Sequence, residues 1–239
     1  MANRSSELDQ EIAAELHAEL MGSFGTETEE WATERLNRVM DRLNAARKDR
    51  TPLSAHVLWI RNFTAFTTPG PHVYVGRLLL ERLPTDEATA FVLAHEAAHH
   101  DCGHLDLFAG WLEKLPRGKT ATVAASVFRH LEHRLYGAER EAEADRYAVD
   151  LCLRARYSGH QCLQAFEVLE QGSLDRGDVD GVFGPENLLD PTDPGHGGTA
   201  FAIQKWIWTR AQRYLPLRER RELATGWLRG REREELRNT

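Results

Sequence analysis

The chain has 239 residues, of which 41% are hydrophobic and 28% are charged, and its formal net charge is −7 at pH 7. A chain of this length can bury one substantial core, while its acidic balance argues against a general nucleic-acid surface. No run approaches the roughly 18 apolar residues that signal a membrane span, and the first residues lack the apolar centre of a secretory signal. We therefore expect a cytoplasmic protein with no membrane span and no nucleic-acid partner; the sequence does not indicate an oligomeric state.

Two segments of helical periodicity begin the chain, at about residues 7–20 and 28–47, and glycines that include Gly22 separate them. We expect residues 1–50 to form a helical segment that packs on the core. Residues 51–239 are expected to form one compact domain. The apolar side of the second helix is marked by Trp31, Leu36, Val39, Met40 and Leu43.

Short strands follow the helical segment. They are expected at about residues 55–60, around Phe66 and at 73–75, with a Pro-Gly-Pro turn at 69–71. The edge of such a sheet can hold an extended peptide by main-chain hydrogen bonds. Such an edge is therefore a candidate for binding an extended chain.

The next helical segment contains the motif H-E-x-x-H, in which His95 and His99 are four residues apart and Glu96 follows the first histidine. Residues at i and i+4 lie on one face of a helix, so both imidazoles can reach one ion. Thr85 is placed to cap this helix, and Asp86 suits the positive end of its dipole. The segment predicts half of a catalytic zinc site, although so short a motif also arises by chance with both histidines in a core.

The third zinc ligand must come from elsewhere, because catalytic zinc takes three protein ligands and leaves a fourth position for water. The metzincin arrangement is excluded, since Cys102 and Leu105 occupy the positions of its glycine and third histidine. A later helical segment, at about 138–155, carries Glu141 and Asp145 on a face with apolar residues. A carboxylate in apolar surroundings needs a partner, so Glu141 is predicted to be the third ligand.

These motifs resemble those of the gluzincin peptidases of the HtpX and CAAX prenyl protease type, peptidase family M48, over about residues 64–151. The family pattern N-A-F-A-x-P-G-G is similar to the segment at 64–70, which has threonine in place of the asparagine. His104 matches a further histidine that often follows the second ligand by five residues. The family pattern E-x-x-A-D is reproduced from Glu141 onward.

The resemblance implies an α+β, mostly helical fold with a zincin-like core, in which a small sheet lies beside the H-E-x-x-H helix. It also implies a zinc-dependent metalloendopeptidase that hydrolyses peptides or unfolded proteins. One zinc ion per chain would be bound by His95, His99 and Glu141. Such an ion activates a water molecule, and Glu96 is predicted to act on that water as the general base.

Asp145 lies one helical turn after Glu141 and has two interpretations. It can accept a hydrogen bond from a ligating imidazole and fix its tautomer, or it can form a surface salt bridge with Arg140 or Arg146. We favour the first because Asp145 shares the face of Glu141. Two functions also remain open: a zinc endopeptidase, or a noncatalytic zinc-stabilised module that binds partners or regulates another protein. Glu96 favours the enzyme, because a structural zinc site needs no base.

The segment at 172–198 is rich in glycine, proline and aspartate and is predicted to be a loop or lid over the cleft. The family pattern T-H-P aligns best with Thr192-Asp193-Pro194, which lacks the histidine. His196 lies three residues further on and is a candidate substitute; an ordinary loop position fits it equally well. Further helices are expected at about 120–135, 161–169, 199–214 and 217–233, and the arginine- and glutamate-rich end of the chain is expected to be a solvated helical face.

Overall fold

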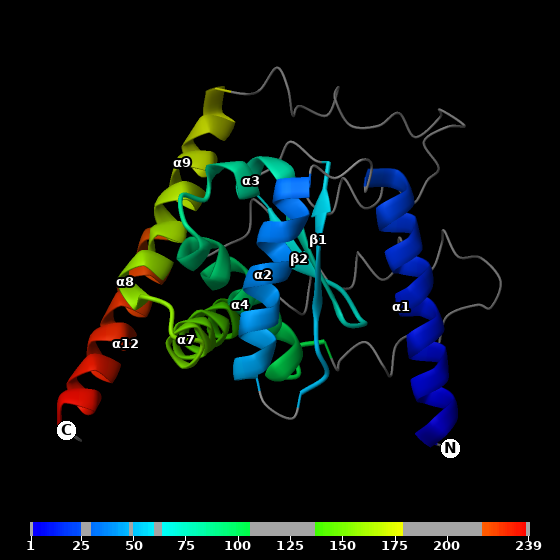
Figure 1. Cartoon of the computed structure of the whole chain (residues 1–239), viewed down its shortest axis with the longest axis horizontal. Coiled ribbons are helices and arrows are strands. Elements are labelled where there is room, and N and C mark those ends of the chain that lie inside the picture. Colours follow the sequence, from blue (N-terminus) through cyan, green and yellow to red (C-terminus); the bar gives the residue numbers. More distant parts are fainter. Residues whose placement is uncertain are drawn as a thin grey trace.

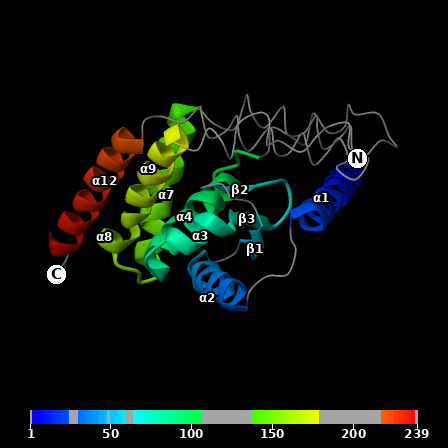
Figure 2. The ribbon, with the colours of Figure 1, turned by 90° about the horizontal axis from the view of Figure 1, so that it is seen from above.

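The computed structural model of the protein describes residues 2–24, 30–47, 50–59, 64–105, 137–178 and 217–237. These residues form a mostly helical fold around one three-stranded sheet (Figure 1). The predicted α+β class is therefore confirmed. The two termini lie at opposite ends of the molecule in both views (Figures 1 and 2). Among the described residues, no helix has both the length and the apolar content needed to cross a bilayer.

The chain begins with α1 (Ala2–Phe24) and α2 (Glu30–Ala46). Gly22, which was expected to separate the two helices, instead lies in the last turns of α1. An exposed helical glycine costs only about 0.5–1 kcal/mol relative to alanine, which is too little to end a helix. The buried face of α2 belongs to the same hydrophobic core as the strands and later helices, and it consists of Ala32, Leu36, Val39, Met40 and Leu43.

The sheet has the strand order β1-β3-β2. The central strand β3 (His72–Gly76) pairs in parallel with β1 (Ser54–Leu58) and antiparallel with β2 (Ala65–Thr67). The predicted turn between β2 and β3 contains Gly70 at φ 99°. A Cβ on this glycine would lie 2.8 Å from the Cβ of Ala13 on α1, so the turn needs glycine both for its backbone conformation and for space.

The register sorts the strand side chains onto two faces, because successive side chains point to opposite sides of a sheet. Val73 and Val75 belong to the main core, which also contains residues of α2 and α4 (Asp86–Asp101). His72 and Tyr74 alternate with them and lie on the other face, where Tyr74 stacks on Phe66. The view from above shows α1 across the sheet from α4 (Figure 2).

α4 follows the short helix α3 (Arg77–Arg82). The predicted cap is present, because the Thr85 side chain accepts a hydrogen bond from the amide of Ala88 at 3.1 Å. Every residue from Ala88 to His99 is buried. α4 is therefore surrounded by other elements, with α7 (Ala138–Arg154) and β2 among its neighbours.

The remaining described helices are α8 (Gly159–Cys162), α9 (Gln164–Asp178) and α12 (Leu217–Arg237). α8 and α12 pack against α7, whereas α9 packs against α4 and α12 (Figures 1 and 2). The predicted loop at 172–198 is wrong in its first part, because α9 continues to Asp178. The rest of that segment, with His196, lies outside the described residues. The helices predicted at 120–135 and 199–214 lie outside them as well.

Candidate metal centre

The packing of α7 against α4 brings together three groups that can bind a metal. His95, His99 and Glu141 each offer one ligand atom within 4.8 Å of the other two, and all three residues are buried. The Nε2 atoms of the two imidazoles are 3.3 Å apart. The Glu141 oxygens lie 3.5 Å from Nε2 of His95 and 3.7 Å from Nε2 of His99.

These distances fit a zinc ion. Ligand atoms about 2.0–2.1 Å from a tetrahedral zinc are separated from one another by about 3.3–3.4 Å, close to the three separations observed. The donor set of two imidazole nitrogens and one carboxylate is common at catalytic zinc sites. Neither oxygen of the buried Glu141 carboxylate accepts a hydrogen bond of ordinary geometry. A metal would therefore add the coordination that this carboxylate lacks.

Asp145 orients the first imidazole. Its Oδ1 atom lies 3.0 Å from Nδ1 of His95. An ionised carboxylate only accepts hydrogen bonds, so Nδ1 of His95 carries the proton and Nε2 is left to bind a metal. Burial alone would lower the pKa of His95, but Asp145 and Glu141 outweigh it and raise the pKa to about 9. In the metal-free protein His95 is therefore protonated at neutral pH, and its positive charge faces the carboxylates of Asp145 and Glu141.

The end of α4 orients the second imidazole. Gly103 adopts φ 71°, and the amides of Gly103 and His104 donate to the carbonyls of His100 and His99 at 3.2 and 3.0 Å. This is a Schellman arrangement, and it places Nδ1 of His104 2.9 Å from Nδ1 of His99. The other nitrogen of His104, Nε2, lies 3.2 Å from Oε2 of Glu143.

The Glu143 carboxylate determines the tautomers of His104 and His99. It accepts a hydrogen bond from the Nε2–H of His104, which leaves Nδ1 of His104 as an acceptor. His99 then donates through Nδ1 and keeps a lone pair on Nε2. The Glu143 side chain is 54% exposed, yet it contacts His104. Both candidate imidazole ligands therefore present the same nitrogen, Nε2, to one point.

Arg220 on α12 completes the charge balance of the site and was not predicted from the sequence. Its guanidinium donates two hydrogen bonds to Asp145, at 2.7 and 2.8 Å, and lies 3.0 Å from Oε2 of Glu141. Burial would raise the pKa of both carboxyls. Arg220 and His95 outweigh that effect at Asp145, and His95, Arg220 and His99 lower the pKa of Glu141 to about 2. The arginine beside Asp145 is thus neither Arg140 nor Arg146.

The model of Peptidase family M48 matches residues 26–204, which is more than half of the chain. The chain belongs to peptidase family M48. Family membership indicates a zinc metallopeptidase with peptide or protein substrates. A search of curated proteins finds no significant match. Within this M48 peptidase, α1 and α12 lie outside the matched range, so Arg220 reaches the candidate metal centre from beyond it.

Glu96 lies beside this centre on α4 and is buried, with 3% of its surface exposed. It is not one of the three residues whose ligand atoms converge. His100 is turned to another side of α4, where its Nε2 contacts the Thr67 hydroxyl, and burial lowers its pKa to about 4. Burial also raises the pKa of the Cys102 thiol to about 11, which disfavours the thiolate that a metal needs. His196 lies outside the described residues.

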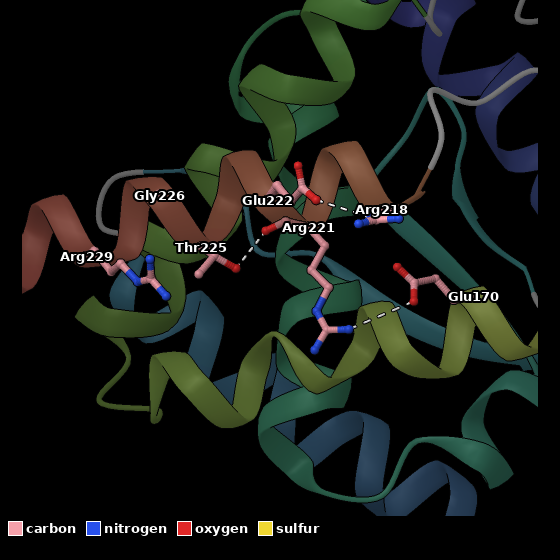
Figure 3. Close-up of a pocket in the computed structure, with 7 residues that line it drawn as sticks. All are labelled: Glu170, Arg218, Arg221, Glu222, Thr225, Gly226 and Arg229. Carbon is pink, nitrogen blue, oxygen red and sulfur yellow. Dashed lines mark hydrogen bonds and ion pairs between the residues drawn. The ribbon is translucent and has the colours of Figure 1, made fainter.

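A pocket of about 480 Å³ lies elsewhere on this M48 peptidase, between α9 and α12 (Figure 3). Four of its charged side chains face one another in two pairs: Arg218 with Glu222 at 3.3 Å, and Arg221 with Glu170 at 3.9 Å. None of the residues that converge at the metal centre lines it. The pocket is therefore separate from the candidate metal centre.

Proposed function

We propose that this chain is a zinc-dependent endopeptidase in which His95, His99 and Glu141 bind zinc and Glu96 is the general base. The observation that carries the proposal is the convergence of three buried ligand atoms at separations of 3.3 to 3.7 Å, next to a buried glutamate. A structural site would normally fill its fourth position with another Cys or His and would need no base.

The chemistry divides between the ion and the protein. A zinc ion, when bound, lowers the pKa of its water ligand toward about 7 and polarises the carbonyl of the scissile bond. The Glu96 carboxylate takes the proton from the attacking water and later passes it to the nitrogen of the leaving amine. Glu96 is buried, and the interactions of its carboxylate with a charged or hydrogen-bonding partner are stronger there than they would be in water.

Three residues around the ligands act as positioning residues. Asp145 holds His95 through Nδ1, and His104 holds His99 through the same ring atom. Arg220 holds Asp145 in turn, so that the carboxylate keeps its place on the imidazole. Groups of this kind fix the tautomer and the ring orientation of metal ligands, and their loss typically costs about 10–100-fold in metal affinity or activity.

The substrate is proposed to be a peptide or an unfolded protein bound in an extended form. β2 lies at one edge of the sheet and beside α4, the helix of Glu96. A peptide added to this edge would form main-chain hydrogen bonds that do not depend on its sequence. Such binding suits a peptidase that accepts many unfolded chains.

The decisive experiment replaces Glu96 by glutamine, which keeps the size of the side chain and leaves the three ligands in place. Glu139→Gln is the matched control, because Glu139 is exposed on α7. We expect Glu96→Gln to retain zinc and to lose activity by about a hundredfold or more on a denatured protein substrate, while the control keeps full activity. A chelator should abolish the activity of both the wild type and the control.

Two results would contradict the proposal. One is full-rate cleavage by Glu96→Gln, which would remove the base from the mechanism. The other is a zinc-loaded wild type that cleaves neither a denatured protein nor a peptide library. The noncatalytic binding module would then be the better interpretation.

A further inference from the structure

A second group of histidines lies on the opposite face of the sheet from the candidate zinc centre. His17 comes from α1, His56 from β1 and His72 from β3, and each offers one ligand atom within 4.8 Å of the other two. All three side chains are partly exposed, so an ion could reach them from solvent. His17 also precedes the residues matched by the family.

The geometry of this group suits coordination. Nε2 of His56 is 3.1 Å from Nδ1 of His72, close to the separation of about 3.3–3.4 Å between two ligand atoms of a tetrahedral zinc. The ring of His17 stacks on that of His72 with centroids 4.0 Å apart. Nδ1 of His17 lies 3.0 Å from the hydroxyl of Tyr74. A hydrogen bond at Nδ1 leaves Nε2 for a metal, as ligating histidines usually require.

The histidines are also in the right charge state. Burial lowers the pKa of His17, and burial together with the neighbouring histidines lowers the pKa values of His56 and His72 to about 4. The three imidazoles are therefore neutral at neutral pH and keep the lone pairs that a metal needs. Three neutral imidazoles favour zinc, copper or nickel, whereas calcium and magnesium require oxygen ligands.

We propose that His17, His56 and His72 bind a second divalent transition-metal ion, such as zinc, and that this ion fastens α1 to the sheet. The three ligands come from three separate elements, so one ion would join the N-terminal helix to both β1 and β3. α1 otherwise meets the sheet region through few polar contacts that the structure describes, among them the amide of Trp59 donating to the carbonyl of Phe24 at 2.7 Å. The ion would therefore add a strong link between this helix and the sheet.

The test counts zinc ions bound to the full chain at a buffered free zinc concentration, using four variants. We expect two ions per chain in the wild type and one each in His17→Ala and His56→Ala. Glu141→Ala, which damages only the first centre, should retain the ion on the second histidine group. His160→Ala is the matched control, because His160 is exposed and pairs with Glu232 on another part of the surface; it should keep two ions.

A second measurement follows α1 itself. In Glu141→Ala, added zinc should slow amide hydrogen exchange in α1 by at least about tenfold, because the ion suppresses local opening. His17→Ala placed in the same background should remove this protection. His17 lies on a helix surface, so its replacement leaves the sheet intact and the folding of the variant can be checked by circular dichroism.

The proposal is overturned if the wild type binds one ion and the histidine variants bind the same number. It is also overturned if zinc does not change exchange in α1. Neither measurement depends on peptidase activity, so these outcomes are distinct from a failure of the proposed catalytic function. A positive result with no cleavage activity would leave the second site standing.

Discussion

Asp145 and Glu141 form a pair of buried carboxylates that face one arginine, and the behaviour of this group depends on single residues. Arg220 is 5% exposed and contacts both of them. Removing one partner of a buried ion pair leaves an uncompensated charge, which typically costs about 3–5 kcal/mol. The arginine is therefore predicted to stabilise the metal-free protein as well as to position a metal ligand.

We predict that Arg220→Met lowers the free energy of unfolding of the metal-free protein by about 3–5 kcal/mol at neutral pH. Arg221→Met is the control, because Arg221 is 39% exposed in its ion pair with Glu167, and pairs of that kind contribute at most about 1 kcal/mol. Equal losses in the two variants, measured by denaturant titration, would show that Arg220 has no special role.

The pH dependence of the same experiment has a definite sign. The pKa of Asp145 is lowered in the folded protein, so its stabilisation is fully present above the unfolded pKa of about 3.9. This stabilisation is lost as the pH falls through the lower folded pKa. The difference between wild type and Arg220→Met should therefore be largest at neutral pH and should shrink in acid.

Local sequence explains why the two helices that carry the candidate ligands could be predicted. Thr85 caps α4, and the i, i+4 spacing of His95 and His99 places both rings on one face. The position of α12 could not be predicted in the same way. Arg220 lies in a run of arginine and glutamate in which local composition gives no sign of burial, and its partners are 75 residues or more away.

α8 and α12 approach each other closely at Gly159. A Cβ on Gly159 would lie 2.5 Å from Cδ1 of Leu228, which is 1% exposed. We predict that Gly159→Ala lowers the free energy of unfolding by about 1–3 kcal/mol, as overpacking of a core usually does. Gly226 on α12 has no atoms within 4 Å of the corresponding position, so Gly226→Ala should stabilise the helix by about 0.5–1 kcal/mol. Opposite signs in thermal unfolding would support this packing, and a stabilised Gly159→Ala would contradict it.

At the scale of the whole molecule, the sheet separates two groups of histidines. The one near α4 could be predicted because two of its members lie in a short motif. The other could not, because His17, His56 and His72 are far apart in sequence and meet only once α1 covers the sheet. Periodicity predicted the strands and the limits of α2 and α7 closely, whereas α1 and α9 extend beyond their expected limits. Contacts between distant elements depended on packing that no local pattern records.

The division into residues 1–50 and 51–239 remains a prediction, and one buried ion pair bears on it. Arg47, directly after α2, donates to Asp101 at the end of α4 with distances of 2.9 and 2.8 Å. The two side chains are 2% and 3% exposed. Tyr147 of α7 also donates to Asp101, so the pair joins the N-terminal segment to both α4 and α7.

We predict that Arg47→Met lowers the free energy of unfolding by about 3–5 kcal/mol, because it leaves Asp101 buried without its cation. The double variant Arg47→Met/Asp101→Asn should recover part of this loss, since no buried charge then remains.

Burial would raise the pKa of Asp101, but Arg47 and Tyr147 lower it. The stabilisation is therefore present above about pH 3.9 and is lost as the pH falls through the lower folded pKa. Tryptophan fluorescence and circular dichroism should give coincident unfolding curves if α2 unfolds together with the rest of the core. A separate early transition in the wild type would instead establish residues 1–50 as an independent unit. A loss of unfolding free energy below about 1 kcal/mol in Arg47→Met would show that this pair contributes no more than a surface salt bridge.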